Sequence, residues 1–278
     1  MEAFQKIHPL EFYRKFLERS VRPDGRSLQR IRNTTVSAGS ILTADGSSFV
    51  KIGNTSVICG VRAEIAEKQQ DQTTSNTCKS QIIVNIEMGP ICSNIFSSTK
   101  PSEKAMSLCT QLNQLVQLLD IDPKQLYFDV DGKYLWYLYV DLYCLDYNGN
   151  ILDAAIIAML SALKNVKLPK GVVSDDGSEV YKEEDTMRTL IINSYLIPLS
   201  FAVIDEYVLS DPSLEEEKLS NGSISIVYNE KRELCLQLYS GITPLDEKTL
   251  QQCLDQTKQR TQEIKDLIDQ SINDSKDK

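Results

Sequence analysis

Histidine and paired cysteines are scarce in this sequence, and each scarcity limits what the chain can do. The one histidine, His8, lies close to the N-terminus, so the rest of the chain offers no imidazole to act as a general base. The seven cysteines include no Cys-x-x-Cys pair, and most lie inside apolar runs, as small buried residues of a reducing compartment do. We therefore expect no zinc site, no disulfide framework and no cofactor.

Basic residues are also outnumbered. The formal net charge is −9 and the sequence pI is about 4.8. A protein that binds nucleic acid through its whole surface needs clustered lysine and arginine, so only a local basic patch stays open here. No apolar run reaches the roughly 18 residues that span a bilayer. We expect a soluble nuclear or cytosolic protein.

Apolar residues, by contrast, are concentrated between Tyr134 and Lys164. The first part, Tyr134 to Leu145, is apolar and rich in aromatics except for Asp141, which predicts a strand buried on both faces. A short turn containing Gly149 leads into an alanine-rich apolar segment that predicts a buried helix. A central strand that turns directly into a helix brings backbone N–H groups and the positive end of the helix dipole to a position suited to an anion.

The other segments predict an α+β chain with two related sheet-and-helix halves, built from antiparallel hairpins rather than βαβ crossovers. Period-two patterns from Asn33 to Ile65 predict a three-stranded antiparallel meander, and Ser102 to Leu119 predicts an amphipathic helix. The second half predicts strands near residues 189–193, 199–208, 223–229 and 234–239 and a long helix from about Asp246 to Ile272, with a disordered tail.

The predicted organisation has four parts. An N-terminal helical arm ends in an Arg-Pro-Asp-Gly-Arg turn, and these five residues taken alone favour a surface loop. The acidic, glycine-containing segment between the two halves predicts a mobile linker. The parts are residues 1–27 (arm and turn), 28–168 (first half), 169–187 (linker) and 188–278 (second half with the long helix).

The order and spacing of several motifs resemble the RNase PH family. They are RPDGR from Arg22, the GS/DGS/K-x-GNT meander from Gly39 to Val61, LDYNGNILDA before the central helix, and DPSLEEE from Asp211. Within the family, the chain is most similar to non-catalytic ring subunits of the RNA exosome. The resemblance implies an RNase PH-like fold and a hexameric ring with other RNase PH-like subunits around an RNA channel. It also implies cap proteins with RNA-binding domains and a separate hydrolytic ribonuclease as partners.

Active members of that family hold phosphate at a Gly-Thr-Arg turn before the central helix. The matching positions here are Asn150, Ile151 and Leu152. Leucine cannot donate a charge-assisted hydrogen bond to phosphate, and the next residue, Asp153, would repel the anion while serving as an N-terminal cap of the helix. The motif therefore favours a structural turn.

Active members also carry arginines on the helix before the central strand. No arginine occurs here from Ala63 to Met187, and lysine would not replace the arginine fork. The lysines of that region, Lys100 and Lys104, lie at its beginning. The corresponding polar positions are neutral: Thr110, Gln111, Asn113, Gln114 and Gln117.

The two carboxylates that active members place after a second-half strand fall on Glu217, which keeps the charge, and on Ser223, which loses it. The run Glu215 to Glu217 is therefore interpreted as a solvated acidic loop. No catalytic and no metal-binding residue is predicted.

From these residues and the resemblance we expect a non-catalytic exosome ring subunit. It would support 3′-to-5′ RNA degradation and processing, including rRNA maturation and mRNA turnover, in the nucleus, nucleolus and cytoplasm. Arg62, Lys100 and Lys104 are candidate RNA contacts, although Arg62 is equally well explained by a pair with Glu64. An active phosphate-dependent 3′-to-5′ exoribonuclease and an unrelated small-molecule α+β enzyme are the alternatives.

Overall fold

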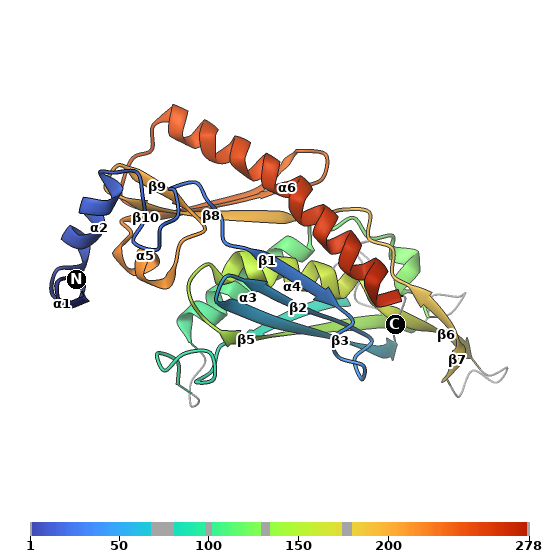
Figure 1. Cartoon of the computed structure of the whole chain (residues 1–278). Coiled ribbons are helices and arrows are strands. Elements are labelled where there is room, and N and C mark those ends of the chain that lie inside the picture. The colour runs from blue at the N-terminus through green and yellow to red at the C-terminus, as the bar shows by residue number, and fades with distance from the viewer. Residues whose placement is uncertain (1, 68–80, 98–101, 129–133, 174–179, 277–278) are drawn as a thin grey trace.

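The computed structural model of the chain describes residues 2–67, 81–97, 102–128, 134–173 and 180–276 (Figure 1). The helices are α1 (Glu2–Ile7), α2 (Pro9–Leu17), α3 (Glu103–Val116), the short 3₁₀ helix η3 (Pro123–Leu126), α4 (Ile151–Lys164), α5 (Leu214–Leu219) and α6 (Glu247–Lys276). The strands are β1 (Thr34–Ala38), β2 (Gly46–Ile52), β3 (Thr55–Glu67), β4 (Ile82–Glu87), β5 (Tyr134–Asp146), β6 (Lys167–Val173), β7 (Val180–Thr189), β8 (Ile197–Ile204), β9 (Tyr207–Ser210), β10 (Gly222–Tyr228) and β11 (Leu234–Gly241).

The helix α4 lies between the two main sheets (Figure 1). The first sheet has the order β1-β2-β3-β5-β4 and the second has the order β11-β10-β8-β9. Every residue of α4 from Ile151 to Leu163 is buried, because one side of the helix meets β2 and β3 and the other meets β8. Ser48 on β2 fixes the helix further by donating a hydrogen bond to the carbonyl of Ala158 (2.7 Å). The prediction of a central buried helix is confirmed.

The predicted three-stranded meander is also confirmed, since β1, β2 and β3 pair antiparallel in sequence order. The prediction of hairpins without crossovers is wrong at one place. Strand β4 pairs parallel to β5, with α3 as the connection between them. Hydrophobic periodicity identified the helix and both strands, but it carries no information about the direction in which strands pair.

The strand β5 is buried on one face only, which corrects the prediction of two covered faces. Alternate residues such as Trp136, Leu138 and Val140 are fully buried against the helices, whereas Tyr143 on the other face is 45% exposed. The aromatic side chains of the outer face kept the hydrophobic pattern continuous although that face is only partly buried.

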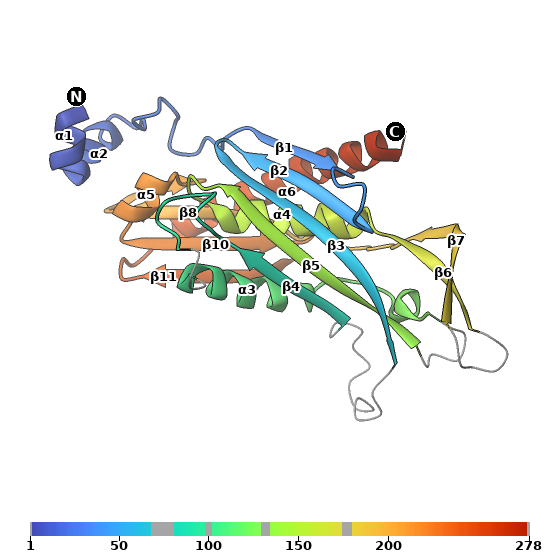
Figure 2. The same ribbon diagram turned by 90° about the horizontal axis from the view of Figure 1, so that it is seen from below.

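The acidic segment predicted as a linker forms an antiparallel hairpin where the structure describes it. Strand β6 pairs with β7 over seven residue pairs, from Lys167 opposite Thr189 to Val173 opposite Val180. Figures 1 and 2 show this hairpin at the end of the molecule opposite the N-terminal arm. The backbone pairing does not depend on alternating apolar side chains, which is why composition alone favoured a linker. The strand predicted at 189–193 is likewise reduced to the end of β7 and an isolated bridge at Ile192.

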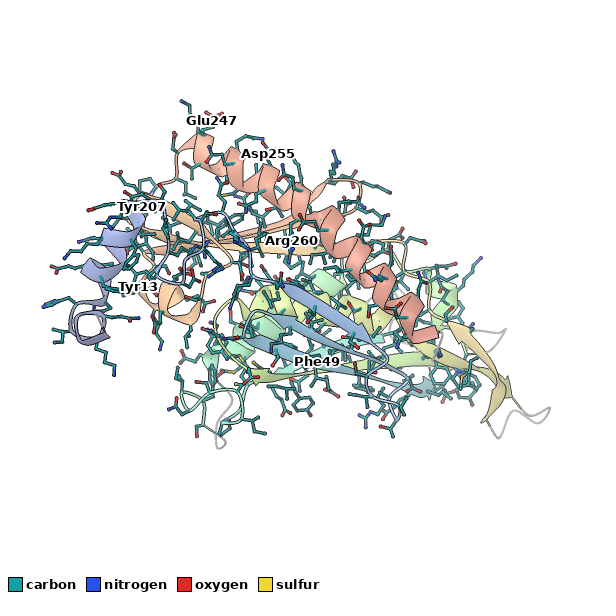
Figure 3. The ribbon with its side chains drawn as sticks, viewed as in Figure 1. Tyr13, Phe49, Tyr207, Glu247, Asp255 and Arg260 are labelled. Carbon is teal, nitrogen blue, oxygen red and sulfur yellow. The ribbon has the colours of Figure 1, made fainter. Side chains whose placement is uncertain are left out.

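The long helix α6 spans both halves (Figure 3 shows its side chains). It packs on β8 and β10 and then reaches β1, where the hydroxyl of Ser271 accepts a hydrogen bond from the backbone N–H of Ala38 (2.6 Å). The predicted disordered tail is wrong up to Lys276, because Ser275 still contacts Asn165 (3.3 Å) and extends the packed face. The polar loop predicted from Glu67 to Ser80 lies, beyond its first residue, outside the described residues. No helix in the described part of the chain has the length and apolar character to cross a bilayer.

Candidate functional site

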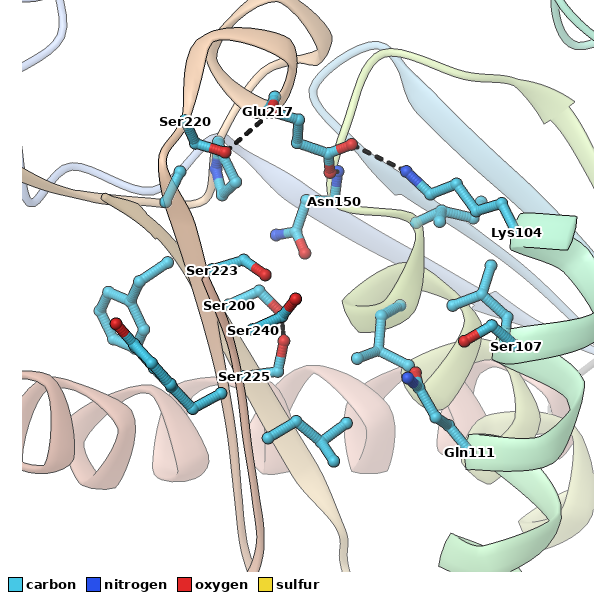
Figure 4. Close-up of a pocket in the computed structure, with 18 residues that line it drawn as sticks. Lys104, Ser107, Gln111, Asn150, Ser200, Glu217, Ser220, Ser223, Ser225 and Ser240 are labelled. Atoms are coloured by element: carbon cyan, nitrogen blue, oxygen red, sulfur yellow. Dashed lines mark hydrogen bonds and ion pairs between the residues drawn. The ribbon is translucent and has the colours of Figure 1, made fainter. Parts of the chain in front are cut away.

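A cleft of about 420 Å³ lies where α3, the N-terminus of α4 and the second sheet meet (Figure 4). It is called the inter-half cleft below. It is lined by residues from each of the three places where the sequence was matched to the family pattern. They are Asn150, Ile151 and Leu152 from the turn before α4, Gln111 from α3, and Glu217 and Ser223 from the second half. The structure therefore brings these separately predicted positions together around one cleft, although the environments of some side chains differ from those predicted.

The turn into α4 is held in a left-handed backbone conformation. Gly149 has φ of 79° and Asn150 has φ of 53°. A side chain at Gly149 would lie about 2.5 Å from the backbone of Ser213 and Leu214, so only glycine fits. The hydroxyl of Thr55 donates to the Gly149 carbonyl at 2.7 Å. The turn is consequently in close contact with the start of α5 and is hydrogen-bonded to β3.

Glu217 points into the inter-half cleft and is not part of a solvated loop. Its Oε1 accepts a hydrogen bond from the backbone N–H of Asn150 (2.6 Å). Its Oε2 accepts from the hydroxyl of Tyr147 (2.6 Å) and from Nζ of Lys104 (2.8 Å). Burial and the neighbouring Glu217 carboxylate raise the pKa of the Tyr147 hydroxyl well above its usual range, which keeps it a donor. The prediction of a solvated loop is wrong because these partners come from the other half of the molecule.

The neighbouring acidic residue Glu216 is buried as well, and for a different reason. It forms a capping box with Ser213 at the start of α5, in which each side chain bonds the backbone of the other residue. Of the three acids, the exposed one is Glu215, which accepts hydrogen bonds from Gln5 and Tyr13 of the N-terminal arm. Within the run of acids, three adjacent carboxylates thus face three different environments.

Asp153 is buried and does not cap its own helix, so the prediction that it serves as the N-terminal cap is wrong. Its carboxylate accepts hydrogen bonds from the N–H and the hydroxyl of Ser200 (3.0 and 2.7 Å) and from Nδ2 of Asn150 (2.8 Å). Burial raises its pKa to about 6, although these hydrogen bonds act in the opposite direction. Asp153 is therefore directed at β8 rather than at an anion near the helix terminus.

The floor of the cleft is a surface of small hydroxyl side chains on the second sheet (Figure 4). Ser223 on β10 lies opposite Ser240 on β11, and Ser225 lies opposite Ser200 on β8, with 2.9 Å between their hydroxyl oxygens. Ser223 thus provides a neutral hydroxyl where the family pattern expects a carboxylate. The charged residues that line the cleft, Lys104 and Glu217, are paired with each other.

The neutral positions of α3 differ in what they do. Gln111 faces the cleft. Asn113 instead joins α3 to β4, since its side chain accepts from the N–H of Val84 (3.1 Å) and donates to the Val84 carbonyl (2.8 Å). Thr110 donates to the carbonyl of Met106 on its own helix. The cleft therefore receives from α3 the amide of Gln111, the hydroxyl of Ser107 and the ammonium of Lys104, but no guanidinium.

The Arg-Pro-Asp-Gly-Arg turn is exposed at Asp24 and Gly25, as predicted for a surface loop, but its first arginine is anchored inside the molecule. Arg22 is fully buried and donates to backbone carbonyls and to Glu216 (3.4 Å). Arg32, ten residues further along, makes a two-pronged ion pair with Asp211 (2.8 and 2.7 Å). Burial alone would raise the pKa of Asp211, but the ion pair with Arg32 and the hydrogen bond from Asn150 outweigh it and hold the pKa below its usual range. These contacts fix α5, and hence Glu217, against the turn into α4.

The candidate RNA contacts lie apart from one another or are occupied. Arg62 is exposed on β3, where its Nε lies 3.3 Å from Glu64 and its guanidinium lies 5.3 Å from the ring centre of Tyr139. Lys104 is bound to Glu217 inside the cleft. Lys100 lies outside the described residues.

The sequence matches the 3′ exoribonuclease family in both of its domains, domain 1 over residues 30–169 and domain 2 over residues 194–260. The exosome complex component rrp43 of Schizosaccharomyces pombe is 31% identical over 252 residues, which cover 91% of this chain and 92% of that protein. The exosome complex component Rrp42 of Methanothermobacter thermautotrophicus is 30% identical over 90% of each chain. Among solved structures, a chain of the Archaeoglobus fulgidus exosome with RNA bound to the active site superposes with a TM-score of 0.77, at 26% identity over 92% of this chain and 96% of that one.

Proposed function

The chain belongs to the RNase PH family of 3′ exoribonucleases, and on this premise we propose that it is a subunit of an RNA exosome ring that supports RNA degradation and processing without cleaving RNA itself. Its relatives named as exosome components align over about nine-tenths of this chain and of their own length, so the ring role concerns the whole chain and not one domain.

The observation that carries the non-catalytic part of the proposal is the position of Glu217. Its carboxylate accepts the N–H of Asn150 at the start of α4, where a bound anion would be stabilised, and it neutralises Lys104. Leu152 lines the same cleft and offers no donor. Phosphoryl chemistry depends on positive groups that hold the phosphate oxygens, and the residues described around this cleft supply no unpaired cation.

An active phosphate-dependent exoribonuclease is the second candidate. It is favoured by one observation, the carboxylate of Glu217 within the cleft, since a carboxylate could assist proton transfer to a leaving group. It is disfavoured because Glu217 already accepts three hydrogen bonds and because Ser223 has no charge.

The proposal extends to partners and location. The ring would contain other RNase PH-like subunits and would bind cap proteins and a separate hydrolytic ribonuclease, in the nucleus, nucleolus and cytoplasm. RNA would pass through the channel of the assembled ring, with Arg62 as the exposed basic contact of this chain. Because this chain has a net charge of −9, the neighbouring subunits would supply most of the positive charge that contacts RNA in the channel.

Affinity purification of the tagged full-length chain, followed by mass spectrometry, tests the ring assignment. We expect other RNase PH-like proteins to be recovered in amounts comparable to the tagged chain, and to remain bound in about 0.3 M salt because a permanent interface is largely apolar. Recovery of the chain as a stable monomer under the same conditions would contradict the ring assignment.

A further inference from the structure

The outer face of the first sheet, which is turned away from α4, carries a compact group of acidic and aromatic side chains. Strand residues alternate between the two faces, so Asp141 and Tyr143 lie outward on β5 while Leu142 between them is buried. Strand β4 places Glu87 directly beside Tyr143. Figure 2 shows β3 and β5 in front of α4, so this face is turned toward the viewer. Asp141, Tyr143 and Glu87 are called the outer patch below.

A gap adjoins the outer patch at Gly60 of β3, which pairs directly with Asp141. A Cβ atom added to Gly60 would have one atom of another residue within 4 Å, Cδ1 of Ile41 at 3.8 Å. Opposed side chains on neighbouring strands stand about 5 Å apart, so the gap lies immediately beside the side chain of Asp141. Ile58, which pairs with Tyr143, lies on the same face. The gap is therefore bordered by a carboxylate and an apolar side chain.

The carboxylates beside the gap are not neutralised by the described part of the chain. Within it, neither Asp141 nor Glu87 makes a hydrogen bond or an ion pair. Arg62, two residues after Gly60 on the same face, pairs with Glu64, on the side away from the gap. Burial and the carboxylates of Glu87 and Asp141 raise the pKa of the Tyr143 hydroxyl, as expected where both charges lie near it. Two such carboxylates attract a cation and repel phosphate.

The cation that suits all of these features is a guanidinium. It is planar and stacks on an aromatic ring, and its N–H groups bind carboxylates as a fork, whereas an ammonium does neither as well. Tyr143 is 45% exposed and therefore has surface to offer for stacking. Tyrosine and arginine are also the residues that contribute most often to the strength of protein interfaces. The outer patch thus has the chemistry of a protein contact rather than of an RNA contact.

We propose that the outer patch is a contact with a neighbouring subunit, which inserts an arginine side chain at the Gly60 gap, where it stacks on Tyr143 and pairs with Asp141 and Glu87. This contact presupposes the proposed ring role of the chain and names the chemistry of one place at which the ring is held together. It gives this acidic chain a specific use for two of its carboxylates.

Cross-linking within the purified complex identifies the occupant of the outer patch. The tagged full-length chain carries the photoreactive residue benzoylphenylalanine in place of Tyr143, and the cross-linked peptides are sequenced by mass spectrometry after irradiation. We expect one peptide from another subunit, with an arginine at or next to the cross-linked residue. A cross-link to RNA, to a second copy of this chain, to another part of the same chain or to a segment without arginine would overturn the proposal.

Two variants test the charge and the gap separately. Asp141→Asn combined with Glu87→Gln removes both charges and keeps the shapes of the side chains. Gly60→Met fills the gap and changes no charge. In about 0.15 M salt, each should make the cross-linked subunit dissociate about tenfold faster, because losing a desolvated charge pair acts mainly on the dissociation rate. The thermal midpoint of each isolated variant should match that of the unsubstituted chain, since the outer patch lies at the surface.

The control is Asp246→Asn combined with Glu247→Gln, which removes the same charge from exposed positions at the start of α6 (Figure 3). It should leave the dissociation rate unchanged. Equal rates for this control and for the Asp141 and Glu87 variant would overturn the proposal. If the unsubstituted chain recovers no RNase PH-like subunit, the proposed function fails together with this contact. If it recovers them and the cross-link lies elsewhere, the contact alone is wrong.

Discussion

Asp153, in the first turn of α4, accepts two hydrogen bonds from Ser200 on β8, one from the backbone N–H (3.0 Å) and one from the hydroxyl (2.7 Å). The pair joins the helix that ends the first half to the central part of the second sheet. Both residues are buried, so the carboxylate is separated from water and its ionisation is unfavourable. This relationship makes the stability of the chain depend on pH in a defined direction.

The first prediction concerns that dependence. In the folded chain the pKa of Asp153 is about 6, raised from 3.8 by burial. The folded chain therefore holds this proton more tightly than the unfolded chain. The resulting contribution to the free energy of unfolding is fully present below about pH 4 and is lost as the pH rises through about 6. Asp153→Asn cannot titrate. The free energy of unfolding of the unsubstituted chain relative to this variant should fall by about 2 kcal/mol between pH 4 and pH 7.

Guanidinium unfolding of both chains at a series of pH values measures this difference. Taking the difference removes the contributions of acids that do not interact with Asp153. A difference that stays constant across this range would show that Asp153 is solvated in the folded chain.

The second prediction compares two arginine forks that differ in burial. Arg32 binds both oxygens of the fully buried Asp211, and Arg14 binds both oxygens of the partly exposed Asp205 (2.8 and 3.0 Å). Lysine cannot reproduce a fork. Arg32→Lys should lower the free energy of unfolding by about 2–3 kcal/mol, since the buried carboxylate loses part of its compensation. Arg14→Lys should hardly change the denaturation midpoint. Equal losses for the two variants would mean that burial does not set the strength of these pairs.

The third prediction concerns assembly. Ala158, in the middle of α4, is completely buried. Ala158→Asp would place an unpaired carboxylate there, at a cost of several kcal/mol against a total stability of about 5–15 kcal/mol. The purified complex should then lack this subunit. Gln259→Asp, on the exposed side of α6, adds the same charge and should be incorporated normally. Normal incorporation of Ala158→Asp would contradict the buried position of α4.

The elements that could be predicted from the sequence are those whose signal is local. The apolar run of β5, the alanines of α4 and the period-two meander each determine their own structure. The parallel pairing of β4 with β5 could not be predicted, because strand direction depends on partners far away in the chain. The β6–β7 hairpin was missed because its acidic composition resembles that of a linker.

The matched positions lie around one cleft, yet the environments of their side chains were predicted less well. Glu217 was interpreted as solvated because its partner Lys104 lies 113 residues away in the sequence. One local signal was present and unused. Ser213 and Glu216 have the spacing of a capping box, which predicts a helix from Leu214 and therefore an ordered Glu217. The burial of Arg22 had no comparable signal, since only its tertiary partners reveal it.

The fourth prediction concerns RNA contact. Arg62 is 66% exposed in its side chain, and its pair with Glu64 is correspondingly weak. Arg62→Glu should leave the assembled ring intact and weaken the protection of RNA inside it, with a larger loss at low salt, because one phosphate contact fewer lowers the salt dependence by about one unit. Arg232→Glu, an exposed change of the same kind in the β10–β11 turn, should leave protection unchanged. If the Arg62→Glu ring protects RNA as well as the Arg232→Glu ring does, Arg62 is a structural or interface residue.

The measurement that tests the central claim most directly is phosphate-dependent release of nucleoside diphosphates from single-stranded RNA by the ring purified through this chain. The ring is compared with one that carries Lys104→Met, which removes the cation of the inter-half cleft. A chain that supports the ring without cleaving RNA predicts the same release from both, whatever the other subunits contribute. A phosphate-dependent release that falls in the Lys104→Met ring of unchanged composition would contradict the claim and identify the cleft as an active site.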